Sequence, residues 1–210
     1  MTKSKVKLSR GEYRSQTLIA QLEKLFLEEG FRDLTVDEIA ARLSCSKRSL
    51  YQIAPSKLEI FLRILDQFLD RIRRMGNRAV LEHDDPAARL AAYMKPGYIE
   101  TKRASRRFVE DIQASKAALQ LLEAHQRERM NTLRDIVDDG IRRDQFRKVN
   151  SLLVAEAYLA AIAKIDDPEF LRRAGLGFSE AFAELYQLIA YGVFRSNPEA
   201  KKPAKQRRNE

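Results

Sequence analysis

Tryptophan is absent from this 210-residue sequence, and cysteine, histidine and glycine number only one, two and eight. The single cysteine, Cys45, rules out an internal disulfide and a cysteine-rich metal site, and it is typical of a reducing compartment. The two histidines, His83 and His125, have no adjacent carboxylate triad at ligand spacing. The sequence therefore predicts no metal site and no other cofactor.

Long hydrophobic runs are also lacking. No apolar segment follows a basic start, so no signal peptide is expected. The most apolar stretches, 152–165 and 185–194, are amphipathic or too short to span a bilayer. We therefore expect a cytoplasmic protein without membrane contacts. A nucleophile elbow, a phosphate-binding loop and an HExxH motif are missing too, which favours a protein that is not an enzyme.

Positive charge is concentrated towards the two ends of the chain. Residues 1–78 contain 16 Lys and Arg against 10 Asp and Glu, whereas residues 79–198 contain 18 of each kind. The last twelve residues contain five basic and two acidic side chains. A basic N-terminal part attached to a neutral body indicates that the N-terminal part meets a polyanion.

Apolar residues recur at helical spacing along most of the chain, and no stretch alternates with a period of two. Three capping boxes, beginning at Ser9, Thr35 and Ser56, predict helix starts. Pro96 and Gly97 are expected to interrupt a later helix. We therefore predict an all-α fold of nine or ten helices.

The stretch 35–57 has the layout of a helix-turn-helix unit, with a helix 36–43, a turn at Ser44 and Cys45, and a second helix from Lys47. In such a unit the second helix enters the major groove of DNA, where basic and amide side chains read base edges. Lys57 lies at the start of the next helix, where free amides favour a phosphate. The predicted DNA-binding residues are Ser46, Lys47, Arg48, Ser49, Tyr51, Gln52 and Lys57.

This stretch resembles the DNA-binding domain of the TetR family of transcriptional regulators. The similarity covers residues 14–65. It rests on Gly30-Phe31, Thr35-Val36, Ile39-Ala40, Ser46, Leu50-Tyr51 and Ser56-Lys57. The resemblance implies an all-helical homodimer on an operator in double-stranded DNA, with Thr35 as a further DNA contact. It also implies a pocket for a small-molecule effector, and a four-helix dimer interface made by the last two long helices.

Two positions depart from the family pattern. Ser44 stands where the family has its turn glycine, so a positive φ there would strain the backbone. Ile53 and Ala54 replace the common aromatic or histidine followed by phenylalanine. We expect the smaller Ala54 to change how the reader helix sits on the long helix that follows.

The body offers apolar side chains, with a few polar ones, that suit a pocket in a helical bundle. Most would serve equally well as core residues, and the polar surroundings of His125 favour a surface position for it. The pocket candidates are Tyr93, Met94, Tyr98, Phe108, Ile112, Leu122, His125 and Met130. The dimer-interface candidates, on the helices 151–165 and 179–194, are Leu153, Ala157, Ala161, Phe182, Leu185 and Ile189.

We therefore predict an arm and three-helix DNA-binding domain (1–55), a connecting helix (56–78), a helical ligand-binding and dimerisation domain (79–197) and a disordered basic tail (198–210). The predicted function is transcriptional regulation by a dimer that a small molecule releases from a palindromic operator, and the sequence favours repression over activation. The alternative is a DNA-binding regulator or organiser controlled by a protein partner, without a small-molecule ligand. A cavity in the body would favour the first function, and a filled core with an exposed apolar patch would favour the second.

Overall fold

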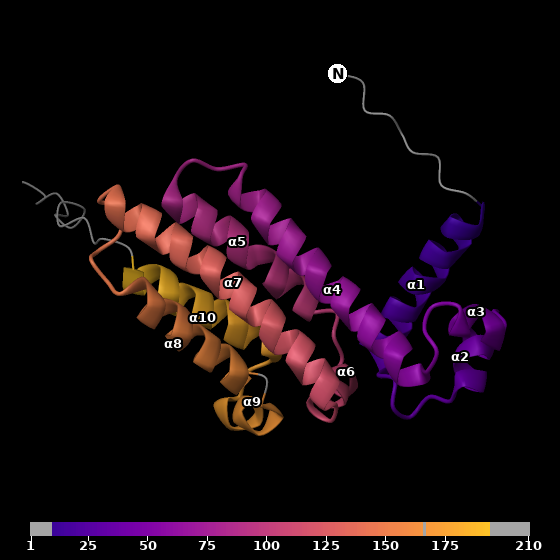
Figure 1. Cartoon of the computed structure of the whole chain (residues 1–210). Coiled ribbons are helices and arrows are strands. Elements are labelled where there is room, and N and C mark those ends of the chain that lie inside the picture. The colour runs from indigo at the N-terminus through magenta and orange to yellow at the C-terminus, as the bar shows by residue number, and fades with distance from the viewer. Residues whose placement is uncertain (1–9, 166, 194–210) are drawn as a thin grey trace, which may run out of the picture.

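The computed structural model describes residues 10–165 and 167–193 (Figure 1). Every secondary-structure element in these two ranges is a helix, which confirms the predicted all-α fold. The helices are α1 (Arg10–Glu29), α2 (Val36–Arg42), α3 (Lys47–Tyr51), α4 (Lys57–Val80), α5 (Pro86–Thr101), α6 (Arg106–Gln113), α7 (Lys116–Arg142), α8 (Ser151–Ile165), α9 (Pro168–Ala174) and α10 (Phe178–Val193). The expected N-terminal arm, the Ser9 cap and the basic tail lie outside the described ranges.

We define the N-terminal head as α1, α2 and α3. Two of the predicted caps begin α2 of the head and the long helix α4 that follows it. The Thr35 hydroxyl accepts a hydrogen bond from the Glu38 amide at 3.2 Å, and the Glu38 carboxylate accepts one from the Thr35 amide at 2.7 Å. The Ser56 hydroxyl accepts from the Glu59 amide at 3.1 Å. Because these bonds satisfy amides that a helix start leaves free, they fix where α2 and α4 begin on either side of α3.

Aromatic side chains join the head to α4. Phe31, after α1, stacks on Phe61 of α4 with ring centroids 3.9 Å apart, and Phe26 meets both rings edge to face. Phe108 of α6 lies 5.8 Å from Phe61 and 5.9 Å from Phe68. The core of the head therefore continues into the body through α6.

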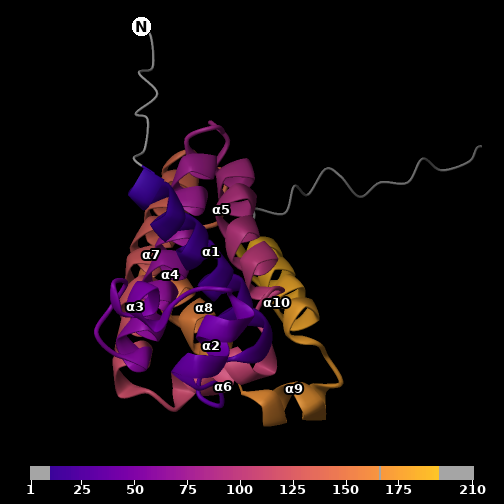
Figure 2. The same cartoon turned by 90° about the vertical axis from the view of Figure 1, so that its right-hand side faces the viewer.

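The body is built on three long helices, α4, α5 and α7, that lie side by side, with α8 and α10 packed against α7 and α5 (Figures 1 and 2). Its core includes the fully buried Leu90 of α5 and Leu133, Ile136 and Val137 of α7. Long α4 belongs to both cores, because its first half packs on the head and its last residue, Val80, joins the body cluster. A displacement of α4 would therefore be felt in both parts.

Pro96 does not interrupt its helix, so the predicted break at Pro96 and Gly97 is wrong. α5 continues to Thr101, and the break comes between Thr101 and Arg106. A proline inside a helix costs a hydrogen bond and crowds the preceding turn. Here Pro96 is buried, and Gly97 lies so close to α7 that a Cβ atom would be 3.2 Å from the Arg129 guanidinium. This close packing on α7 outweighs the local preference for a break.

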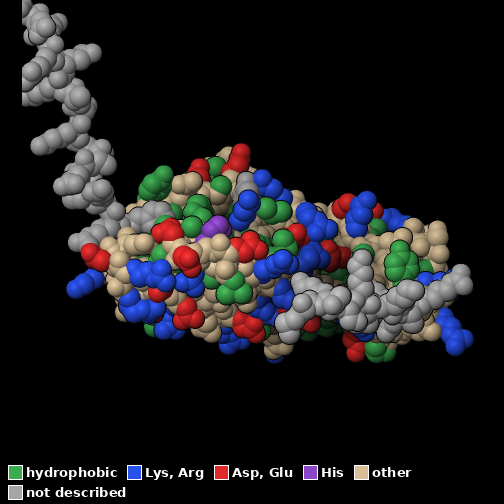
Figure 3. All heavy atoms as spheres, turned by 90° about the horizontal axis from the view of Figure 1, so that it is seen from above, with side chains coloured by type: hydrophobic (Ala, Val, Ile, Leu, Met, Phe, Trp, Pro, Cys, Tyr) green, Lys and Arg blue, Asp and Glu red, His purple; other side chains and the backbone are tan. Residues whose placement is uncertain are grey.

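The face shown in Figure 3 carries acidic and basic side chains next to one another, with isolated hydrophobic ones between them. Such a mixture is typical of a solvated surface. Among the described helices, none is long and apolar enough to cross a membrane.

Candidate nucleic-acid interface and cavity

The short helix α3, which contains most of the predicted reading residues, lies at one end of the molecule (Figure 1). Ser46 caps it, because its hydroxyl accepts from the Ser49 amide at 3.1 Å. Leu50 is fully buried and anchors the helix on the head core. With Leu50 pointing inward, Arg48, Tyr51 and the other reading side chains face outward: Lys47 and Gln52 are exposed and Ser49 is half-buried.

The two basic residues of α3 have different surroundings. Lys47 Nζ lies 2.6 Å from Asp37 Oδ1, and this contact raises the pKa of Lys47. Arg48 forms no ion pair with any residue in the described ranges. Exposed ion pairs are weak, so Lys47 can leave Asp37 for a phosphate or a base at small cost. Arg48 can make such a contact without breaking one.

Lys57 holds the loop between α1 and α2. Its Nζ donates to the carbonyls of Arg32 and Leu34, both at 2.8 Å, and lies 5.4 Å from the centre of the Phe31 ring. An ammonium group has three donors, so one remains for a phosphate. Sequence reasoning missed this structural role because the two carbonyls belong to a loop more than twenty residues earlier.

The turn before α3 contains the strain that the sequence predicts. Ser44 has a φ of 49°, in the left-handed region that glycine tolerates best. After α3, Ile53 is buried and Ala54 is half-buried in the head core. The Ile53 carbonyl also accepts from Arg63 of α4 at 2.6 Å, which ties the end of α3 to the connecting helix.

A cavity of about 120 Å³ lies in the body between α4, α5, α6, α7, α8 and α10. Five of the predicted pocket residues line it: Phe108, Ile112, Leu122, His125 and Met130. Of the others, Met94 lines a neighbouring space of about 290 Å³ between α5, α8 and α10. Tyr93 is buried between α4 and α7, where its hydroxyl donates to the Arg129 carbonyl at 3.0 Å. The Tyr98 side chain lies outside the described part of the structure.

His125 is buried, so the predicted surface position is wrong. Only 7% of it is exposed, it lines the cavity, and its Nδ1 has no hydrogen-bond partner in the described structure. Burial, together with the positive charges of Arg129 and Arg73, lowers its pKa to about 3 against the opposing effect of Asp70. The imidazole is therefore neutral at neutral pH. The polar neighbours of His125 in the sequence gave no sign that this one position of the helix turns inward.

Sequence reasoning also missed Arg129, which is 7% exposed and lines the same cavity. Arg129 lies four residues after His125, and residues at this spacing share a face of a helix. The inward-facing Leu122 and Met130 could have indicated that face. An arginine, however, is almost never assigned to a core from sequence alone, because buried charges are rare.

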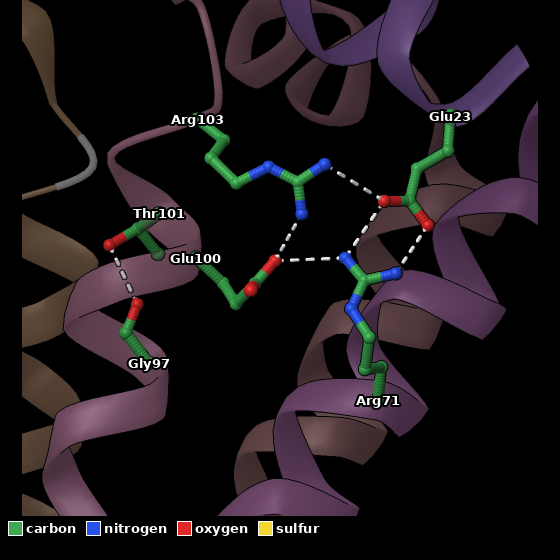
Figure 4. Close-up of polar contacts among 6 residues, drawn as sticks. All are labelled: Glu23, Arg71, Gly97, Glu100, Thr101 and Arg103. Atoms are coloured by element: carbon green, nitrogen blue, oxygen red, sulfur yellow. Dashed lines mark hydrogen bonds and ion pairs between the residues drawn. The ribbon is translucent and has the colours of Figure 1, made fainter. Parts of the chain in front are cut away.

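Four charged side chains connect the head to the body (Figure 4). Arg71 of α4 binds both oxygens of Glu23, on α1, at 2.6 and 2.8 Å, and it also binds Glu100 of α5 at 2.8 Å. Arg103 completes the set, with contacts of 2.6 Å to Glu100 and 3.4 Å to Glu23. Burial raises the pKa of Glu100, but the hydrogen bonds from Arg71 and Arg103 outweigh it and the pKa is lowered. Glu100 is therefore ionised at neutral pH, and we call this set the Glu23–Arg103 cluster.

A second connection runs through α6. The buried carboxylate of Asp111 accepts from the amide of Phe31 at 2.5 Å and from that of Arg32 at 3.3 Å. Gly30, with a φ of 77°, makes this approach possible, because a Cβ atom there would lie 2.7 Å from the carboxylate. On the other side of α6, Ile112 lines the cavity. One short helix therefore contacts both the cavity and the turn of the head.

The last two long helices carry large hydrophobic side chains on their outer face. Leu153 of α8 is 68% exposed, and Leu188 and Tyr191 of α10 are 71% and 77% exposed. Of the other predicted dimer residues, Ala157 is exposed, Ala161 and Ile189 are half-buried, and Phe182 and Leu185 are buried within the body of a single chain. The two most exposed of these side chains, Leu188 and Tyr191, are not among the predicted interface residues.

The head and the fold are matched by known proteins. Residues 18–64 match the model of the bacterial regulatory proteins of the tetR family. A stretch of 86 residues is 38% identical to the HTH-type transcriptional activator FasR of Mycolicibacterium smegmatis, covering 41% of this chain and 39% of FasR. The chain thus matches about two fifths of the length of this curated relative.

Solved structures match over nearly the whole chain. A putative transcriptional regulator from Saccharomonospora viridis, in complex with choline, has a TM-score of 0.72 at 14% identity and covers 87% of this chain and 98% of its own. A TetR transcription regulator from Haloarcula marismortui has a TM-score of 0.72 at 18% identity, over 87% and 99% of the two chains. At these identities the likeness shows the shared fold.

A helix-turn-helix head on a helical body defines a DNA-binding transcriptional regulator. The head, over residues 18–64, therefore matches the tetR family of bacterial regulatory proteins, and the chain shares its overall fold with a solved TetR transcription regulator.

Proposed function

We propose that the chain is a homodimeric regulator that binds a palindromic operator and leaves it when a small molecule enters the body cavity. The observation that carries this proposal is the placement of the cavity. Gly97, Thr101 and Ile112 line it from α5 and α6. Asp111 of α6 binds the turn after α1 directly, and Glu100 of α5 reaches Glu23 of α1 through Arg71 of α4. A cavity in this position favours a small-molecule effector over control by a protein partner, and such an effector acts in the cytoplasm, where the operator lies.

On DNA, α3 would lie in the major groove with Arg48, Gln52 and Lys47 directed at base edges, and Ser46, Ser49 and Tyr51 at base edges or phosphates. Thr35 and Lys57 lie at the starts of α2 and α4, where helix amides add to phosphate binding. In a dimer the two α3 helices would meet successive major grooves, so the operator would have two half-sites about one helical turn, or a multiple of it, apart.

Dimerisation would use the outer face of α8 and α10. Leu153, Leu188 and Tyr191 expose apolar surface there that a second copy can cover, and helices paired about a twofold axis form a four-helix interface. The binding of two heads to one operator depends on this pairing. The spacing of the heads is then the quantity that an effector can change.

The effector would act by favouring one of two arrangements of α4, α5 and α6. A ligand shifts such an equilibrium only by binding the two arrangements unequally. Filling the cavity would move Ile112 and Thr101 outward from it, and the attached Asp111 and Glu100 would carry that movement to the turn after α1 and to Arg71. The long helix α4 would tilt and the two heads would change their separation.

Repression requires only that the dimer occupies a promoter, so we propose repression, although the curated relative is named as an activator. A reporter gene under the selected operator distinguishes the two, because deleting the regulator raises expression if it represses and lowers expression if it activates.

The experiment that tests DNA binding is selection of bound duplexes from a random library, followed by affinity measurements with variants of the head. Arg48→Ala should weaken binding by about 1–3 kcal/mol and relax the preference at one base position. Lys57→Ala should weaken binding to all sequences alike. It should also reduce the slope of log affinity against log salt concentration by about one. If neither variant changes DNA affinity, α3 is not the reading helix.

A further inference from the structure

One corner of the cavity carries a positive charge without a balancing acid. Arg129 forms no ion pair in the described ranges, and only 7% of it is exposed. Its protein contacts are the Tyr93 carbonyl, 3.4 Å from Nη2, and the Tyr93 ring, whose centre lies 5.0 Å from the guanidinium carbon. Neither contact neutralises the charge. A buried charge is costly unless it is paired, so this corner is built for an anion that the chain itself does not supply.

His125 adds a second polar group to the same corner. It lies one helical turn before Arg129 on α7, and its buried Nδ1 has no partner in the described structure. Because burial and the charge of Arg129 lower the pKa of His125, the ring is neutral at neutral pH. A neutral imidazole can donate one hydrogen bond to a ligand oxygen without adding a second charge. The corner therefore offers one cation and one neutral donor.

The remaining wall of the cavity defines the rest of the ligand. It contains no aspartate or glutamate, and its other polar side chains, Thr101, Gln113, Gln126 and Tyr158, are uncharged. A cationic ligand would face Arg129 without a counter-charge, and a dianion would bring one charge more than the corner can neutralise. Most of the wall is aliphatic or aromatic, as with Phe68 and Phe182. The composition fits a monoanion with an apolar body.

We propose that the cavity binds a small carboxylic acid with an apolar body, its carboxylate paired with Arg129 and hydrogen-bonded to His125. The planar carboxylate fits the guanidinium fork, which can donate two parallel hydrogen bonds to it. The apolar part would replace empty space against Phe68 of α4 and Phe182 of α10. This inference rests on the proposed effector-binding role of the cavity.

The test is binding of straight-chain carboxylates of six to twelve carbons to the free full-length dimer, measured by calorimetry without DNA. Alcohols and amines of the same chain length serve as head-group controls, and choline, the ligand in the structural neighbour, serves as a cationic control. We expect one carboxylate per chain to bind, with the alcohols and amines at least about 10-fold weaker, as the loss of a charge-assisted hydrogen bond implies. An equal affinity for alcohol and carboxylate, or no binding of any carboxylate in the series, would overturn the proposal.

Variants locate the carboxylate. Arg129→Gln should lower carboxylate affinity by about 10- to 100-fold and leave alcohol affinity unchanged. His125→Asn should cause a smaller loss confined to the carboxylates. Arg127→Gln is the matched control, because it removes an exposed arginine of the same helix that does not line the cavity. A loss of carboxylate binding in Arg127→Gln equal to that in Arg129→Gln contradicts the assignment. If Arg129→Gln does not fold, the head-group selectivity of the unaltered protein still decides whether the cavity binds a carboxylate.

The same measurement keeps this inference apart from the proposed function. Carboxylate binding to free protein without any change in operator affinity would refute ligand-controlled release and leave the carboxylate site standing. Operator release by a neutral or cationic compound, with no carboxylate binding, would refute the carboxylate site and leave ligand-controlled release standing.

Discussion

At residue 44 the backbone adopts a left-handed conformation that costs a non-glycine residue about 1–2 kcal/mol. The residue lies in the turn that sets α3 against α2, so its strain is placed at the DNA-reading unit. Glycine would adopt this conformation without steric cost, although it loses more conformational freedom on folding. The balance favours glycine, because the conformational penalty exceeds the added entropy.

We therefore expect Ser44→Gly to raise the free energy of unfolding by about 0.5–1 kcal/mol, measured by chemical denaturation. Ser44→Ala is the control, since alanine keeps the Cβ atom that causes the strain and should give no gain. Equal stabilisation by both substitutions would place the effect in the loss of the hydroxyl instead.

His125 predicts a pH dependence of stability. Its folded pKa is about 3 and its ordinary value is 6.5, so the unfolded chain binds a proton between these limits while the folded chain does not. Stability is therefore full above pH 6.5 and falls as the pH is lowered towards 3. The groups that face the ring are Arg129, Arg73 and Asp70, and the two arginines disfavour its protonation.

At pH 5 this residue should cost the unaltered protein about 2 kcal/mol of unfolding free energy relative to pH 7. The comparison is with His125→Gln, which cannot titrate, in denaturation curves at both pH values. The difference between the two proteins cancels acid effects that they share. If both lose the same stability between pH 7 and pH 5, His125 is not buried in its neutral form.

At the scale of helices, local signals and long-range packing differ in how far they can be predicted. The caps of Thr35 and Ser56 could be predicted because partner and cap lie three residues apart. The path of α5 through Pro96 could not, because the packing of Gly97 on α7 that supports it joins residues far apart in the chain. The burial of His125 and Arg129 could not be predicted for a related reason: a polar side chain gives no local sign that its face of the helix turns inward.

The end of α7 shows such packing clearly. Gly140 lies against the ring of Phe146, and a Cβ atom there would be 2.6 Å from Phe146 Cγ. Gly140→Ala should therefore lower the unfolding free energy by about 1–3 kcal/mol through overpacking. A double-mutant cycle isolates the cause, because in a Phe146→Ala background the same change should be neutral or slightly stabilising. A full loss in both backgrounds would point to the helix backbone instead.

The exposed apolar side chains on the outer face of α10 predict that a dimer interface lies there. Leu188→Glu should convert the proposed dimer to a monomer, because a buried unpaired carboxylate is strongly unfavourable in an apolar interface. Sedimentation velocity measures the change, and circular dichroism should show an unaltered helix content. Leu81→Glu is the matched control, since Leu81 is 85% exposed in the turn after α4, and it should remain dimeric. A dimer that survives Leu188→Glu would place the interface on another face.

At the scale of the whole molecule, the cavity and the DNA-reading head are joined by two polar connections over a shared aromatic core. The division into a head, a connecting helix and a body could be proposed from sequence because charge and motif change along the chain. The connections could not, since Glu23 and Glu100 are 77 residues apart in the sequence and look like ordinary surface residues there. Their burial around Arg71 is a property of the folded chain alone.

The Glu23–Arg103 cluster should couple effector binding in the cavity to the position of the head. Glu100 belongs to the same turns of α5 as Gly97 and Thr101, which line the cavity, and it reaches Glu23 of α1 through Arg71. Glu100→Gln keeps the size of the side chain but weakens its hold on both arginines. We expect effector affinity in the absence of DNA to stay within about threefold, while the change in operator affinity caused by the effector shrinks by about 0.5–2 kcal/mol.

The measurement is operator binding by fluorescence anisotropy with and without the effector, and effector binding with and without operator. Because coupling between two sites is reciprocal, both pairs of affinities must give the same reduced coupling. Glu128→Gln is the control: Glu128 pairs with Arg73 between α7 and α4 at 2.9 Å but makes no ion pair with the head, so its coupling should be unchanged. Equal losses of coupling in the two variants would mean that α4 responds to the total charge around it and not to the contact with Glu100. An unchanged coupling in Glu100→Gln would leave Asp111 of α6 as the connection that moves the heads.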